Sequence, residues 1–173
     1  MLPSNANLQV LKSLFATISF LLYACFSIAQ PVLPQRSLTV TATQSIHFGT
    51  FCAPGGTGGT VTVGFDGSRT SSGEIILLSA APTAQPAIFE IKLCQGRNVV
   101  ITYSSTTILS SGSGGFLILD IGPTELGVNG SRFPTNNDCN FITPLRIGGT
   151  LHVPGNPPPG NYSGSFNITF NQE

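Results

Sequence analysis

The sequence predicts an all-β fold, a two-sheet antiparallel β-sandwich, from its composition and from the spacing of its apolar residues. Its 173 residues include 20 glycines and 13 prolines but only 8% charged residues, so turn formers are plentiful. Apolar and polar residues alternate in several segments, most clearly where Phe166, Ile168 and Phe170 share one face of the last predicted strand. No helical period extends over ten residues outside the first 29. About eight strands, spaced by roughly 10 to 15 residues, predict one sandwich domain over residues 38–173.

Residues 1–29 have the pattern of a secretory signal peptide. Lys12 is the only charged residue among them, and an apolar run covers residues 14–28. The small residues Ser27 and Ala29 stand at positions −3 and −1 before Gln30, so we expect cleavage after Ala29. A membrane-spanning anchor is the alternative, although such an anchor needs about 20 apolar residues and this run is shorter.

The cysteines bear on both anchoring and disulfide formation. Residues 22–25, Leu-Tyr-Ala-Cys, resemble the lipobox of bacterial lipoproteins, so lipidation of Cys25 is a third possibility for the N-terminus. Otherwise the exported chain keeps Cys52, Cys94 and Cys139, of which at most one pair forms within the chain. We expect the pair Cys52–Cys94, whose loop of about 42 residues would contribute about 4 kcal/mol of stability. Cys139 is then left as a quiet thiol or as the site of a bond between molecules.

The predicted strands begin after a short flexible lead, residues 30–37. In the first strand, Leu38, Val40 and Ala42 alternate with threonines, a pattern typical of β-structure. The glycine-rich stretch that follows, residues 53–59, lacks the order of a phosphate-binding loop and is expected to be a turn. Further strands are predicted at residues 61–65, 74–78, 87–93, 99–103 and 116–121.

Three features of the second half set expectations about topology. About four residues separate strands 87–93 and 99–103, which favours an antiparallel hairpin. The polar stretch 127–140 is expected to be a long surface excursion. Residues 145–153 are predicted to form one bent strand or two short ones, with a bulge at Gly148-Gly149.

Short motifs along the chain resemble two families. Residues 88–94, an Ile-Phe-Glu-Ile-Lys-Leu strand that leads to a cysteine, and residues 162–170 resemble segments of chaperone–usher pilus subunits. A larger ordered set resembles a bacterial exported family catalogued as domain of unknown function 4402, over nearly all of residues 38–170. The motifs of this second resemblance are residues 46–49, 59–63, 147–153 and 160–170. Both families imply an immunoglobulin-like sandwich at the cell surface.

The resemblance to pilus subunits implies particular roles for the two ends of the domain. Such subunits lack one strand, and a neighbour's extended N-terminal segment fills the resulting groove. Carried over, the final strand with Phe166, Ile168 and Phe170 would be a groove edge. Residues 30–43 would be a donor segment, and Leu38, Val40 and Ala42 would be the inserting side chains. In the alternative, residues 38–43 form a strand of the domain's own sheet, and the sandwich is self-complete.

No group of residues predicts catalysis or a bound cofactor. His47 and His152, without a carboxylate or cysteine at motif spacing, are too few to predict a metal site. No nucleophile-elbow order is present, and the acidic residues are spaced singly. The formal net charge is zero at pH 7, so no basic field exists for nucleic acid. We therefore expect no enzymatic activity, no cofactor, no metal and no nucleic-acid partner.

These observations predict an exported, non-enzymatic structural or adhesive subunit, fimbria-like, which associates through β-strand edges. Its expected location is the bacterial cell surface or the extracellular space, reached through the periplasm, with no transmembrane span in the mature chain. The expected partners are other surface or pilus subunits and a periplasmic chaperone. The alternative is a self-contained monomeric module that binds carbohydrate or protein or serves as a coat, with or without a lipid anchor.

Overall fold

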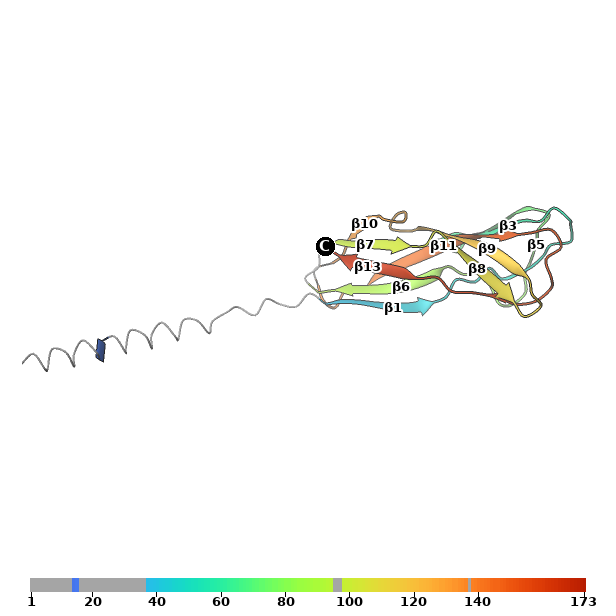
Figure 1. Cartoon of the computed structure of the whole chain (residues 1–173). Helices are drawn as coiled ribbons and strands as arrows, with labels where there is room; N and C mark the ends of the chain where they lie inside the picture. Colours follow the sequence, from blue (N-terminus) through green and yellow to red (C-terminus); the bar gives the residue numbers. More distant parts are fainter. Residues whose placement is uncertain (1–13, 16–36, 95–97, 137) are drawn as a thin grey trace, which may run out of the picture. The chain divides into compact units, whose positions relative to one another are not determined.

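In the computed structural model, the chain from residue 37 onward folds as an all-β domain (Figure 1). The structure describes residues 14–15, 37–94, 98–136 and 138–173. The predicted signal peptide and flexible lead therefore lie outside the described residues, apart from Ser37 and from residues 14–15, which are helical and belong to a separate unit, Met1–Gln35. Within the described part of the chain, no helix is long and apolar enough to cross a membrane.

Thirteen strands lie in the described residues of the domain, and all their pairings are antiparallel. The strands are β1 (Leu38–Gln44), β2 (Thr50–Cys52), β3 (Gly59–Val63), β4 (Arg69–Gly73), β5 (Ile76–Leu78), β6 (Ala87–Leu93), β7 (Asn98–Tyr103), β8 (Thr106–Ser111), β9 (Phe116–Thr124), β10 (Arg132–Pro134), β11 (Thr143–Val153), β12 (Tyr162–Ser163) and β13 (Ile168–Gln172).

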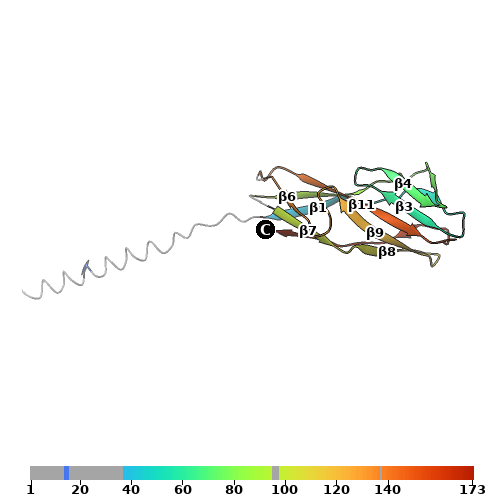
Figure 2. The same ribbon diagram turned by 90° about the horizontal axis from the view of Figure 1, so that it is seen from above.

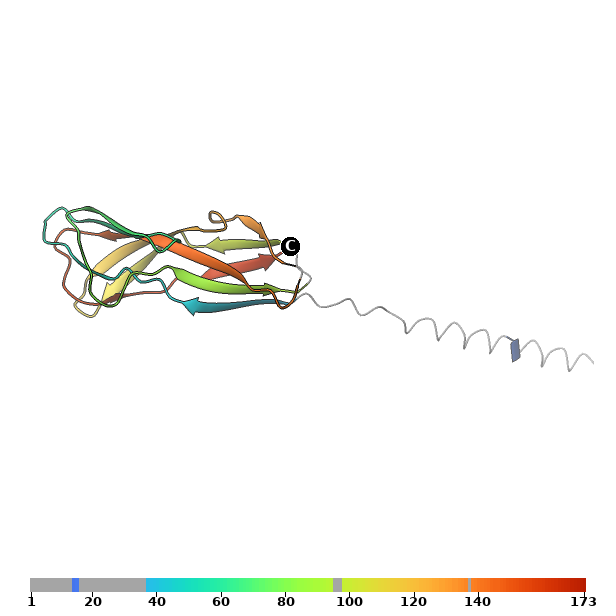
Figure 3. The same ribbon diagram turned by 180° about the vertical axis from the view of Figure 1, so that it is seen from behind.

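The strands form one large sheet and two small ones. The large sheet has the order β1-β6-β11-β9-β8-β12, and β3 and β4 extend it beside β11. β11 (orange in Figure 3) organises this sheet, since its first half pairs with β6, its second half pairs with β3, and β9 lies along its other side. The small sheets are β10-β7-β13 and β2-β5. Together they make the second layer over the large sheet.

The core lies between the two layers as one cluster of buried side chains from all three sheets. In β7, for example, Val99, Ile101 and Tyr103 are buried while Thr102 is exposed, as the predicted period of two requires. The largest fully buried residues are Ile91, Leu93, Ile101, Leu117, Leu119, Leu145, Ile147 and Leu151. The predicted all-β sandwich is thus confirmed.

Two topological expectations have different outcomes. The predicted hairpin of strands 87–93 and 99–103 is wrong, because β6 pairs with β1 and β11 whereas β7 pairs with β10 and β13. The chain crosses from one layer to the other here, which lets both strands bury one face in the same core. The single bent strand is confirmed as β11, whose register against β9 shifts between Ile147 and Gly149.

The second layer changes along the domain. Among the described strands, it consists of β10, β7 and β13 at the end that holds Glu173, and of β2 and β5 at the other end, near β3 and β4 (Figures 1 and 2). The chain reaches β2 from β1 and reaches β13 from β12, crossing between layers each time. These two crossings interrupt the second layer between its two small sheets.

Candidate functional site

An open groove of about 940 Å³ lies where the second layer is incomplete. One side is formed by the end of β1, by β2 and by the residues between them, and the other side by residues 157–166, which lead towards β13. Inward-facing leucines of the large sheet form the floor: Leu109, Leu117, Leu119 and Leu151. Of these leucines, Leu109 is half-buried, whereas Leu117, Leu119 and Leu151 are each at most 2% exposed, so the accessible apolar surface of the groove comes mainly from its sides.

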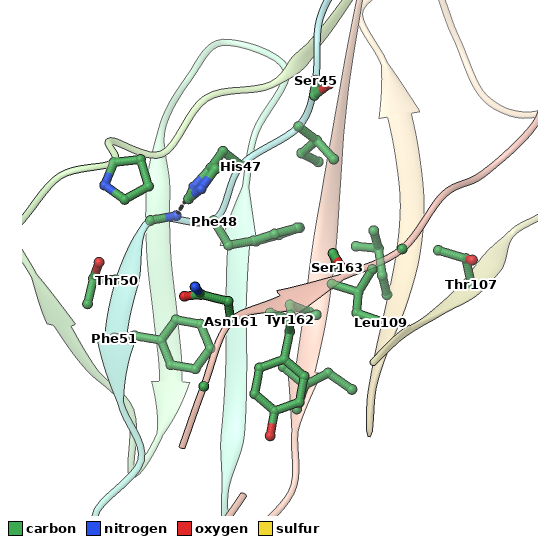
Figure 4. A pocket seen from close by; sticks show the side chains of 18 of the residues that line it. Ser45, His47, Phe48, Thr50, Phe51, Thr107, Leu109, Asn161, Tyr162 and Ser163 are labelled. Atoms are coloured by element: carbon green, nitrogen blue, oxygen red, sulfur yellow. Dashed lines mark hydrogen bonds between the residues drawn. The ribbon is translucent and has the colours of Figure 1, made fainter. Parts of the chain in front are cut away.

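Aromatic side chains from both sides reach into the groove (Figure 4). Phe48 and Phe51 come from the side that holds β2, and Tyr162 comes from β12 on the opposite side. The Tyr162 hydroxyl donates to the carbonyl of Pro158 at 2.6 Å, which fixes the ring. His47 accepts the backbone N–H of Gly49 on its Nδ1 at 2.8 Å, so that nitrogen carries no proton in this arrangement.

The side chains that line the groove belong to apolar and polar residue types. None of its residues, all within the described part of the chain, is Asp, Glu, Lys or Arg. Its polar members are mainly serines, threonines and asparagine, together with His47 and Tyr162. A charged ligand placed here would lose hydration without gaining an opposite charge. The groove is therefore suited to an uncharged, largely apolar occupant.

β13 continues one side of the groove and has an open edge. Among the described strands it pairs only with β7. Ile101 of β7 donates its N–H to Ser131 and accepts that of Gly130, both on the β10 side, so its backbone groups face away from β13. In an antiparallel ladder, the backbone groups of two directly opposite residues either both point at each other or both point away from each other. Phe170 lies opposite Ile101, so its N–H and C=O point away from β7, towards the open edge of β13. The backbone groups at the open edge belong to Ile168, Phe170 and Gln172.

The predicted strand-edge residues lie together on this side of the domain. Ile168 and Phe170 are half-buried in β13, and the Phe170 ring packs on Phe89 of β6 with centroids 5.9 Å apart. Phe166 lies just before β13, is also half-buried and lines the groove. Their alternation with exposed Asn167 and Thr169 follows the predicted pattern.

The predicted donor residues have a different place. Leu38, Val40 and Ala42 lie in β1, opposite Leu93, Ile91 and Phe89 of β6. These residues therefore belong to a strand of the domain's own sheet and not to an extended arm, which corrects the donor interpretation for them. The physical reason is that an alternating apolar strand fits its own sheet edge as well as a neighbour's groove. Ala42, at the end of β1, lines the groove.

The predicted pairing of Cys52 with Cys94 is wrong. Cys94 is bonded to Cys139, with Cα atoms 4.3 Å apart, and Cys52 is a free, exposed thiol in β2. The sheet explains the pairing, because Ile91 lies opposite Thr143, so the chain before β11 passes the end of β6. β2 lies at the other end of the domain.

The two histidines lie apart. His47 lines the groove, whereas His152 lies on β11, where its Nε2 is 2.7 Å from Oδ2 of Asp120 on the neighbouring strand β9. Among the described residues, no cluster of three or more His, Cys, Asp or Glu side chains could hold a metal ion.

Arg69 supports the β2 side of the groove. From β4, its guanidinium donates to the carbonyl of Thr50 at 2.8 Å and to that of Leu78 at 3.1 Å, which joins both strands of the small sheet to the large one. The guanidinium also lies close to Gly49, since a Cβ placed on that residue would be 3.0 Å from Cζ of Arg69. Burial lowers the pKa of Arg69, which stays charged at neutral pH.

Several groove residues were not identified from the sequence. Phe48 and Tyr162 belong to the family-like motifs, but nothing in their spacing showed that they face each other across a groove. Leu109 lies in β8, whose Thr-Thr-Ile-Leu-Ser-Ser sequence is too polar to predict a floor position. These residues come together because the chain crosses from the large sheet to the second layer before β2 and again before β13, and the sequence does not indicate either crossing.

The fold and the site define a small antiparallel β-sandwich with an uncharged apolar groove beside an open strand edge. Residues 38–171 match the family model described as "Domain of unknown function (DUF4402)", and the chain belongs to this family. This match confirms the resemblance to this family and leaves the resemblance to chaperone–usher pilus subunits untested. Searches of curated proteins and of solved structures each found no match.

Proposed function

We propose that this protein is an exported, non-enzymatic structural or adhesive subunit of the bacterial cell surface that associates with other subunits through β-strand addition. The observation that carries the proposal is the groove beside the open edge of β13. A strand placed there would hydrogen-bond to Ile168, Phe170 and Gln172. It would also cover half-buried apolar side chains of the groove, such as Leu109 and Phe166. The signal-peptide pattern of residues 1–29 supports export.

The strand order supports the same proposal. An immunoglobulin-type sandwich places its first, second, fifth and fourth strands in one sheet and its third, sixth and seventh in the other. Here β1-β6-β11-β9 corresponds to the first sheet, and β7-β13 to the third and sixth strands. The described chain has no counterpart of the seventh strand, and its position is the open edge of β13. On this reading the domain is an immunoglobulin-like sandwich that lacks one strand.

A charge placed in the groove tests the proposal in the bacterium that carries the protein. Ala42 and Thr41 are neighbours in β1 and both are exposed, but only Ala42 lines the groove. We expect wild-type protein in high-mass surface complexes that dissociate on heating. The Ala42→Lys variant should be absent from these complexes, although its midpoint of thermal unfolding is unchanged. Thr41→Lys should behave like wild type. Wild-type protein found only as a monomer, or Ala42→Lys in normal complexes, would argue against strand addition.

The second candidate is a self-contained, monomeric binding or coat module, with or without a lipid on Cys25. The position of β1 favours it, because the domain supplies its own first strand. Size-exclusion chromatography of protein extracted gently from the cell surface separates the two candidates. A monomer that retains full stability supports the module, and fatty-acid labelling that disappears in Cys25→Ser supports its anchored form.

A further inference from the structure

The side chains that line the groove and the backbone groups of the open edge indicate what kind of strand would fill it. This inference rests on the proposed function. We propose that the occupant is an uncharged extended segment with apolar side chains at every second position, and that a different protein supplies it, not a second copy of this chain.

The groove itself specifies the side chains of the occupant. Its floor is made of leucines and its sides present Phe48, Phe51 and Phe166, so inward-facing side chains of the occupant must be apolar. No Asp, Glu, Lys or Arg lines it, so an inward-facing charge would have no partner. Outward-facing side chains would meet solvent and are free to be polar, which gives the alternating pattern.

The open edge specifies that the occupant is a polypeptide. Ile168, Phe170 and Gln172 present N–H and C=O groups in alternation along the edge of β13. A lipid chain could cover the half-buried apolar side chains of the groove but could not satisfy this row of donors and acceptors. An extended backbone has the matching groups at the matching repeat. The edge therefore favours a strand over an acyl chain.

The sequence of this chain argues against a second copy as the donor. Its alternating segment, residues 38–44, is already β1 and is paired along its length with β6. The preceding lead, residues 30–37, contains Pro31 and Pro34, which have no N–H to donate. Its two large apolar residues, Val32 and Leu33, are adjacent and would point to opposite faces of a strand. The predicted leader, residues 1–29, is expected to be removed.

Strand extensions at the C-terminus test this without knowledge of the natural partner. β13 ends at Gln172, and Glu173 still donates its N–H to Asn98, so an Asn-Gly turn after Glu173 would return the chain along the open edge. Three proteins, each with residues 1–173, would carry this turn followed by eight residues. The first extension alternates Thr with Val or Leu, the second has Lys in place of each Val and Leu, and the third copies residues 30–37.

We expect only the first extension to raise the midpoint of thermal unfolding above that of the unextended protein, by more than about 5 °C. If the copy of residues 30–37 raises it equally, a second copy can donate and the inference is overturned, although strand addition stands. If the Lys extension raises it equally, the groove does not select uncharged strands and the inference is again overturned. If no extension raises it, the groove accepts no strand and the proposed function itself fails.

Discussion

Among single residues, Arg69 connects the small β2–β5 sheet to the large sheet. Its guanidinium supplies the donors for the carbonyls of Thr50 and Leu78. Arg69→Met would remove both, so we expect a loss of about 1–3 kcal/mol in the free energy of unfolding, measured in urea. Arg132→Met is the control, because the exposed ion pair of Arg132 with Glu173 should contribute less than about 1 kcal/mol. Equal effects of the two substitutions would contradict a specific role for Arg69.

Tyr103 is expected to lower the stability of the domain at alkaline pH. The residue is buried in β7, and burial raises the pKa of its phenol. The folded state therefore holds the phenol proton more tightly than the unfolded state. This contribution to stability is complete below the ordinary tyrosine pKa of about 10 and is lost as the pH rises through the folded-state pKa. We expect the unfolding free energy of Tyr103→Phe to fall less between pH 8 and pH 10.5 than that of wild type. The same fall in both proteins would show that another group sets the limit.

At the scale of elements, the bulge in β11 depends on a close backbone approach. A Cβ at Gly148 would lie 2.3 Å from the carbonyl oxygen of Val63 and 2.9 Å from the nitrogen of Phe65. We expect Gly148→Ala to lower the free energy of unfolding by about 1–3 kcal/mol, because the backbones must separate. Gly112, in the turn after β8, has no atom within 4 Å of such a Cβ, so Gly112→Ala should change it by less than about 0.5 kcal/mol. A neutral Gly148→Ala would mean that β3 and β11 can move apart freely.

The sequence predicted the strands that bury alternate residues and missed several of those that do not. β6, β7, β9, β11 and β13 each contribute side chains to the core at every second position, so their period is visible. β4 is Arg-Thr-Ser-Ser-Gly and β12 is Tyr-Ser, and neither has an apolar face to detect. β10, inside the stretch expected to be a surface excursion, is held by pairing with β7 and by one buried side chain, Phe133. Backbone pairing leaves no periodic signal in the sequence.

At the scale of the whole molecule, the sequence could identify the members of the site but not their arrangement. The alternation of Phe166, Ile168 and Phe170 predicted a half-buried last strand, which β13 confirms. The same alternation at Leu38, Val40 and Ala42 was equally compatible with a donor arm and with an internal strand, because period alone does not specify a partner. The groove arises from two layer crossings of the chain, and a crossing has no residue pattern of its own.

The disulfide joins segments far apart in the chain, so its effect belongs to the whole fold. Cys94 and Cys139 are 45 residues apart, and closing such a loop should stabilise the domain by about 4 kcal/mol through the unfolded state. We expect Cys94→Ala with Cys139→Ala to lower the free energy of unfolding by about that amount. Cys52→Ser should leave it unchanged within about 0.5 kcal/mol, because that thiol is exposed and free. Urea unfolding of both variants decides between the pairings. A Cys52–Cys94 bond would make Cys52→Ser as costly as the double variant, and it would leave Cys139→Ala alone without effect.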